Sequence, residues 1–128
     1  MISKKKALLA AELAEAKMAE NIVILDMRKL SNITDFFIIA TSSSITRSQA
    51  IADSIRQSLR KAGESVSRIE GYREADWMLV DAYDVVVHIF SDEARDFYNI
   101  ESLWADAPRV RLCQKKTKTR SKKTSKRK

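Results

Sequence analysis

The residues that could perform catalysis are few, and they lie far apart in this sequence. Nucleophilic catalysis needs a base beside the nucleophile, yet the only histidine, His88, stands in the middle of an apolar segment that reads as a strand. We interpret His88 as a structural, partly buried residue. One histidine and one cysteine, Cys113, give none of the usual spacings of metal ligands. We therefore expect a protein that is not an enzyme and that has no metal and no cofactor.

A phosphate-binding loop is poorly supported as well. Such loops place glycines ahead of a helix, because only glycine lets the backbone amides approach a phosphate closely. Ser42, Ser43 and Ser44 precede a predicted helix, but no glycine accompanies them. We interpret these serines as helix caps.

The last predicted helix carries aromatic and acidic residues whose spacing points to binding. Tyr98 and Glu101 are one turn apart, and Trp104 lies a further turn along the same flank. Tyr and Trp are enriched at protein interfaces because they bury apolar area yet keep a polar group. The same two aromatic residues could instead complete the core, and the pattern leaves both interpretations open. The apolar flank expected to face a sheet consists of Phe97, Ile100 and Leu103.

The formal net charge of +7 is concentrated at one end of the chain. Residues 114–128 contain nine of the 24 Lys and Arg residues and no acid, so 15 bases remain against 17 acids elsewhere. Residues 64–107 contain eleven acids and three bases, a net charge of −8. The basic end suits nucleic acid, and the acidic segment suits a basic protein partner. Acids also keep small domains soluble, so charge alone does not decide between these roles.

Length and composition indicate one folded domain with a tail. We expect residues 1–112 to form a single domain, with residues 1–18 as an N-terminal helix, and residues 113–128 to be a basic, disordered tail. The single cysteine fits a reducing compartment. No apolar run approaches the roughly 18 residues of a membrane span, so we expect a cytoplasmic protein without membrane contact.

The elements that must position these residues alternate between helix and strand. The first helix should present Leu8, Leu9, Leu13 and Ala16, and the strand at 22–25 should be buried on both faces. Gly63 is placed to end the second helix, and a hairpin should join the fourth and fifth strands. The order predicts an α/β fold with a mixed β-sheet of about five strands and flanking helices. The predicted helices are 4–19, the segment from the serine caps to about 62, and the segment from 91 to before Pro108; the strands are 22–25, 36–40, 66–69, 77–80 and 85–90.

Seven segments, taken in order, match a known pattern. They are Asn21–Asp26, Ile33–Thr41, Ala50–Asp53, Glu70–Gly71, Asp76–Asp81, Asp84–Phe90 and Arg95–Trp104. On these segments the chain resembles the ribosomal silencing factor family, also called the RsfS or Iojap family, over nearly all of residues 19–107. Any one segment alone would be a weak signal, but seven at family spacing make a strong one.

The resemblance implies a nucleotidyltransferase-like α/β fold used as a binding module. Members of the family dock on the large ribosomal subunit at the ribosomal protein called L-fourteen, and so hinder joining of the small subunit and repress translation. Free members often pair as homodimers. Trp77 and Tyr98 would be buried anchors, and acids would pair with Lys or Arg of the partner. The docking residues implied by the resemblance are Trp77, Asp81, Tyr98, Glu101 and Trp104. Arg95 is expected to pair with an acid inside the chain.

The chain departs from the family pattern at two turns and at its end. The family usually has glycine at the positions of Ser42 and Tyr83, so both turns must form here with ordinary residues. The basic tail lies beyond the resemblance. We expect it to contact ribosomal RNA through Lys115, Lys116, Lys118 and Arg120.

The sequence is compatible with two other functions. One is a residual nucleotidyltransferase that would use Asp26, Asp35 or Asp81 as metal ligands. The other is a general RNA-binding protein driven by the tail.

Overall fold

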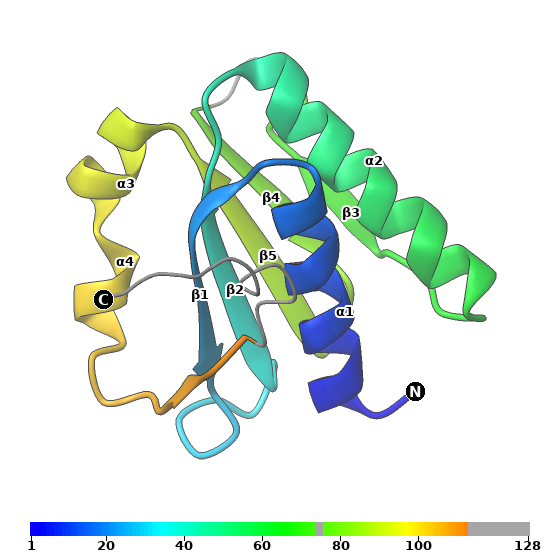
Figure 1. Cartoon of the computed structure of the whole chain (residues 1–128). Helices are drawn as coiled ribbons and strands as arrows, with labels where there is room; N and C mark the ends of the chain where they lie inside the picture. Colours follow the sequence, from blue (N-terminus) through cyan, green and yellow to red (C-terminus); the bar gives the residue numbers. More distant parts are fainter. Residues whose placement is uncertain (74–75, 113–128) are drawn as a thin grey trace, which may run out of the picture.

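The computed structural model describes residues 1–73 and 76–112 (Figure 1). The predicted RNA-contact residues Lys115, Lys116, Lys118 and Arg120 lie outside the described residues. In chain order the elements are α1 (Ser3–Ala16), β1 (Glu20–Asp26), β2 (Phe36–Thr41), α2 (Ile45–Lys61), β3 (Arg68–Glu70), β4 (Trp77–Asp81), β5 (Val85–Phe90), α3 (Asp92–Tyr98), α4 (Ile100–Leu103) and β6 (Arg109–Val110).

The strands form one mixed sheet in the order β3-β4-β5-β2-β1-β6. The β2 and β5 strands run parallel at its centre, and every other neighbouring pair is antiparallel. The predicted α/β class, mixed sheet and β4–β5 hairpin are confirmed. The sixth strand, β6, was not predicted, because its two residues have no periodicity of their own and are ordered by pairing with Ile24 and Leu25 of β1. The likeness to nucleotidyltransferases stays a prediction.

Helices α1 and α2 cover one face of the sheet (Figure 1). The predicted helix is present and Leu8, Leu9 and Leu13 pack against the core, but the fully buried side of α1 is formed by alanines and one lysine. Small side chains let the helix approach the strands closely, while the leucines pack at the margin and Ala16 is exposed. The buried residues of α1 are Lys6, Ala7, Ala10, Ala11 and Ala14.

The α2 helix begins and ends where its sequence predicts. The Ser44 hydroxyl accepts a hydrogen bond from the Arg47 amide at 3.1 Å, which caps the first turn. Gly63 follows the last turn with φ +82, a conformation that glycine adopts without strain. The residues that α2 buries are Ser48, Ile51, Ala52, Ile55 and Leu59.

A buried cation ties α1 to the β4–β5 turn. The Lys6 ammonium donates to the Ala82 carbonyl at 2.9 Å and pairs with Asp84 at 2.7 Å and Glu64 at 3.3 Å. At the same turn Tyr83 has φ +69, so a non-glycine residue adopts the left-handed conformation there. Tyr83 therefore forms, as a non-glycine residue, the turn at which the family usually has glycine. Ser42, in contrast, is not among the positive-φ residues of the described chain, and its turn needs no glycine.

Strand β1 is less buried than predicted. Within the predicted strand at 22–25, Ile24 and Leu25 are buried but Ile22 and Val23 are only partly buried, and the pairing with β2 is irregular between Glu20 and Val23. Only residues 24 and 25 of β1 pair with β6 on its outer side. The apolar run therefore indicated the strand correctly but overstated its burial.

The single C-terminal helix predicted from the sequence is divided into α3 and α4 at Asn99. Asn99 has φ +42, a left-handed conformation that asparagine tolerates better than most residues. This break turns the two halves relative to one another. Phe97 and Leu103, predicted to face the sheet, are consequently 81% and 74% exposed.

Candidate protein interface

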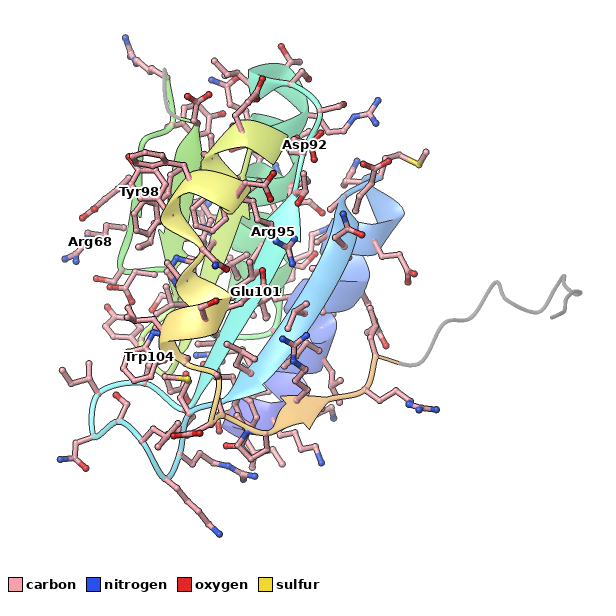
Figure 2. The ribbon with its side chains drawn as sticks, turned by 90° about the vertical axis from the view of Figure 1, so that its left-hand side faces the viewer. Arg68, Asp92, Arg95, Tyr98, Glu101 and Trp104 are labelled. Carbon is pink, nitrogen blue, oxygen red and sulfur yellow. The ribbon has the colours of Figure 1, made fainter. Side chains whose placement is uncertain are left out.

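The second face of the sheet is covered by α3 and α4 over only part of its width (Figure 2). Because successive strand residues point to opposite faces, Phe37, His88 and Trp77 lie on this side from β2, β5 and β4. The core beneath the two short helices is small. It contains Leu25, Met27, Ile39, Phe90, Ala94 and Ala107, with Val23, Phe37, Trp77, Ile100 and Trp104 packed against it.

Aromatic side chains form a continuous chain across this face. The Trp77 ring lies 4.8 Å from that of Tyr98 and 5.1 Å from that of Phe90, measured between centroids. His88 lies 5.9 Å from Trp77 and 4.7 Å from Phe37. The Phe37 ring then meets Trp104 edge-on at 6.1 Å. Three residues predicted for the site, Trp77, Tyr98 and Trp104, are thus joined through rings from three strands, from α3 and from the residue that follows α4. We call this set the aromatic face: Phe37, Trp77, His88, Phe90, Tyr98 and Trp104.

His88 is the buried member of the aromatic face that forms a hydrogen bond with Trp77. Its imidazole is buried, and Nδ1 accepts a hydrogen bond from the Trp77 indole Nε1 at 3.1 Å. Burial lowers the pKa of His88 to about 4, so the ring is neutral at pH 7. Since Nδ1 accepts, the proton lies on Nε2, which is buried without a hydrogen-bond partner in the described chain. The structural role expected of His88 is therefore to accept the hydrogen bond that orients the Trp77 indole.

A groove of about 600 Å³ opens beside Trp77 and Tyr98. Phe97 and Tyr98 line it from α3, and their rings meet edge-on at 5.0 Å. Asp76 and Glu93 stand at its rim and are exposed. The groove therefore combines apolar rings with two carboxylates, a lining that suits an apolar segment bearing a cation. Its lining residues are Asp76, Trp77, Glu93, Ala94, Phe97 and Tyr98.

The two acids predicted for docking already have partners within the chain. Glu101 accepts a hydrogen bond from Arg95 Nε at 3.0 Å and lies 3.9 Å from Arg109. The predicted internal pair of Arg95 is thereby confirmed, and this arginine also donates to the Thr41 hydroxyl at 2.9 Å. Figure 2 shows Arg95 and Glu101 turned toward one another across the α3–α4 break. Asp81 lies 3.8 Å from Arg68. Asp76 and Glu93 have no ion pair recorded among the described residues.

Sequence reasoning missed part of this surface. The sequence pattern places Phe37 and Phe90 in strands and Phe97 on the flank facing the sheet, and it does not indicate Asp76 or Glu93 as site residues. A signal for Phe90 was present, because a β4–β5 hairpin with a short turn places it opposite Trp77, as the register shows. No comparable signal existed for Phe97, whose exposure depends on the break at Asn99.

The acids considered for a nucleotidyltransferase are not gathered into one site. Asp26 accepts two hydrogen bonds from the Arg28 side chain, at 2.9 and 2.7 Å. This contact lowers the pKa of Asp26. Asp81 lies at the end of β4 and pairs with Arg68. Within residues 1–73 and 76–112, no group of three or more His, Cys, Asp or Glu side chains is arranged to hold a metal ion. In the same residues no helix is both long enough and apolar enough to span a bilayer.

Comparison with known proteins gives a consistent match. Residues 2–128 match the family described as "Ribosomal silencing factor during starvation". The match is wider than residues 19–107 and includes the basic tail, so the prediction that the tail lies outside the resemblance is wrong. The ribosomal silencing factor RsfS of Halalkalibacterium halodurans is 43% identical over 104 residues, which are 81% of this chain and 89% of that protein. RsfS of Bacillus subtilis is 44% identical over 100 residues, 78% of this chain and 85% of the relative.

The fold has solved counterparts as well. The crystal structure of a protein from Chromobacterium violaceum superimposes with a TM-score of 0.79 at 34% sequence identity. The alignment covers 89% of this chain and 94% of the other.

Proposed function

We propose, from the premise that this chain belongs to the ribosomal silencing factor family, that it silences translation by occupying the large ribosomal subunit. In this proposal it docks on ribosomal protein L-fourteen and blocks joining of the small subunit. The relatives named above are ribosomal silencing factors. The observation that carries the proposal is the aromatic face, because Trp77, Tyr98 and Trp104 are joined on one side of the sheet.

The shape and exposure of this face support a role in docking. Tyr98 is 49% exposed and Phe97 81%, whereas Trp77 beneath them is only partly exposed. A partner side chain entering the groove would therefore meet ring faces that are already held in place. Such pre-ordered aromatic pockets dominate binding energy at protein interfaces.

The charge around the groove supports a basic partner. Asp76 and Glu93 border it, and Asp92 and Asp96 are exposed on α3. Because Asp81 and Glu101 are engaged by arginines of the chain, we assign the partner's cations to Asp76 and Glu93 instead. Opposite potentials would speed encounter and orient the complex.

Steric occupation accounts for silencing without a chemical step. Two bodies cannot occupy the same subunit surface, so inhibition requires only that the factor stays bound. The proposal therefore asks for no catalytic residue, and Asp26 and Asp81 form ion pairs with Arg28 and Arg68 within the chain.

Co-sedimentation with purified large subunits tests the docking step. Trp77→Ala and Tyr98→Ala should each weaken retention by roughly tenfold or more, as expected for central aromatic anchors. Ile2→Ala is the matched control, because Ile2 is an apolar side chain, 72% exposed, at the start of α1 on the other layer. The proposal is lost if the subunits do not retain the unaltered chain at moderate salt.

A joining assay tests the block itself. Adding the chain to large subunits before small subunits should lower the yield of joined ribosomes, and Trp77→Ala should restore it. A complex that contains both subunits and the factor together would contradict steric exclusion.

A further inference from the structure

We infer that the edge of the sheet at residues 109–112 binds the phosphate backbone of ribosomal RNA beside the docked protein partner. We call this segment the arginine edge: Arg109, Val110, Arg111 and Leu112. The inference rests on the proposed function, because it places RNA and a ribosomal protein side by side.

Strand geometry turns two cations outward on the same side. Val110 and Leu112 pack against the core under α1. Because side chains alternate along an extended chain, Arg109 and Arg111 point to the opposite face, roughly 7 Å apart. Both are exposed, and the Arg109 side chain is 60% accessible. A groove of about 360 Å³ runs along this edge between the segment and Ile22, Val23 and Ile24.

The arginine edge borders the aromatic face. Arg109 Nη2 lies 3.9 Å from Glu101 Oε2 on α4, the helix that Trp104 follows. The edge is also fixed in place, because the Asp26 amide donates to the Pro108 carbonyl at 2.7 Å and β6 pairs with β1. A partner seated on the aromatic face would therefore have these two guanidinium groups at its margin.

The charge balance at this edge stays positive. Glu101 lies near Arg109 through Oε2, and its other oxygen, Oε1, forms an ion pair with Arg95 at 3.0 Å. From Ala107 to Lys128 the sequence contains eleven Lys and Arg residues and no acid. The arginine edge is thus the beginning of a stretch of sequence that carries cations and no acid. The predicted contacts Lys115, Lys116, Lys118 and Arg120 belong to its continuation.

A phosphate backbone fits this edge better than an acidic protein or a membrane. A segment that carries cations and no acid suits the regularly spaced phosphates of a nucleic acid backbone. Each guanidinium can donate two parallel hydrogen bonds to one phosphate. The apolar residues of the segment, Val110 and Leu112, are partly buried against the core, so they offer little free apolar surface to a bilayer. Membrane binding by basic segments generally needs such apolar insertion for strength.

The salt dependence of binding tests the inference in the full-length chain. The association constant is measured between about 50 and 200 mM salt, and its logarithm is plotted against the logarithm of the salt concentration. Replacing two phosphate contacts should make the slope of this plot shallower by about 1.5. The binding targets are intact large subunits, protein-free large-subunit RNA, isolated L-fourteen and anionic phosphatidylglycerol vesicles. The variant is Arg109→Gln combined with Arg111→Gln. A second variant changes Lys115, Lys116, Lys118 and Arg120 to Gln.

A control of equal charge separates position from net charge. Lys4→Gln combined with Lys5→Gln removes two exposed cations from α1. We expect the arginine variant to lower the slope for subunits and for RNA. The lysine control should leave both slopes unchanged, and neither variant should alter binding to isolated L-fourteen. The four-residue variant should lower the RNA slope further.

Three results would overturn the inference. One is an arginine variant that behaves like the lysine control on subunits and on RNA. Another is a variant that loses affinity for isolated L-fourteen as strongly as for subunits, which would make the edge a protein contact. The third is tighter binding of the unaltered chain to the vesicles than to RNA. If the unaltered chain binds neither large subunits nor isolated L-fourteen, the proposed function is refuted. Its binding to protein-free RNA, with and without the two arginines, would still decide the inference about the arginine edge.

Discussion

The Trp77 indole donates a hydrogen bond from Nε1 to Nδ1 of His88, 3.1 Å away, between neighbouring strands of the hairpin. The two rings also lie 5.9 Å apart. Trp77 is the residue of the aromatic face that contacts Tyr98 and Phe90 as well. The orientation of the largest ring at the candidate interface is therefore set by a buried histidine.

Removing the acceptor at His88 should loosen this indole. His88→Phe leaves the Trp77 N–H without a partner but also removes the buried, unpaired Nε2–H of His88, so the net loss of folding free energy should be about 1 kcal/mol or less. The exchange of the indole proton, followed by nuclear magnetic resonance, should become faster. His88→Asn offers a side-chain oxygen as acceptor and should retain most of the protection. Unchanged exchange in His88→Phe would show that the hydrogen bond does not hold the ring.

Buried His88 should make folding stability depend on pH. Its folded pKa of about 4 is below the reference value of 6.5, so the unfolded chain binds the proton more readily between these values. Stability contributed by the neutral ring is complete above pH 6.5 and is lost as the pH falls toward 4, by about 3 kcal/mol. Urea unfolding at several pH values measures this change.

The matched variant for this measurement is His88→Asn, which cannot titrate. The difference between the two proteins isolates the histidine from the carboxylates, which also titrate near pH 4. Parallel pH profiles for the two proteins would contradict the depressed pKa.

The left-handed turn at Tyr83 should be improved by glycine. Tyr83 has φ +69, where a side chain beyond glycine is strained. Allowing for the greater freedom of glycine in the unfolded chain, Tyr83→Gly should stabilise the fold by about 0.5 to 1 kcal/mol, or about 3 °C in Tm. Tyr83→Ala keeps the Cβ and serves as the control, with no gain expected. Equal melting temperatures for the two variants would argue against strain.

The buried lysine on α1 should be important for stability. Lys6→Ala removes the cation that Asp84 and the Ala82 carbonyl share. We expect a loss of about 2 kcal/mol, below the value for a fully buried pair because Asp84 is partly solvated. Lys5→Ala, at an exposed position on the same helix, should change stability by less than about 0.5 kcal/mol. Similar losses in both variants would show that the ion pairs contribute little.

Much of the fold was predictable because its signals are local. Apolar β-branched runs indicated β2 and β5, the short link 81–84 indicated the hairpin, and Ser44 and Gly63 marked the two ends of α2. Each of these depends on backbone propensities within a few residues. The seven matching segments likewise indicate the family from the sequence alone.

The tertiary structure decided which side chains meet. Helical periodicity predicted one C-terminal helix, but Asn99 adopts φ +42, and the Arg95 contacts to Glu101 and Thr41 hold the parts together. The break at Asn99 leaves Phe97 exposed, and the contact with Arg95 gives Glu101 an internal partner. The β6 strand and the buried position of Lys6 also depend on residues distant in the chain. Sequence alone thus determined the elements and the kinds of residue available, whereas their pairings arise from packing between segments whose proximity no local pattern encodes.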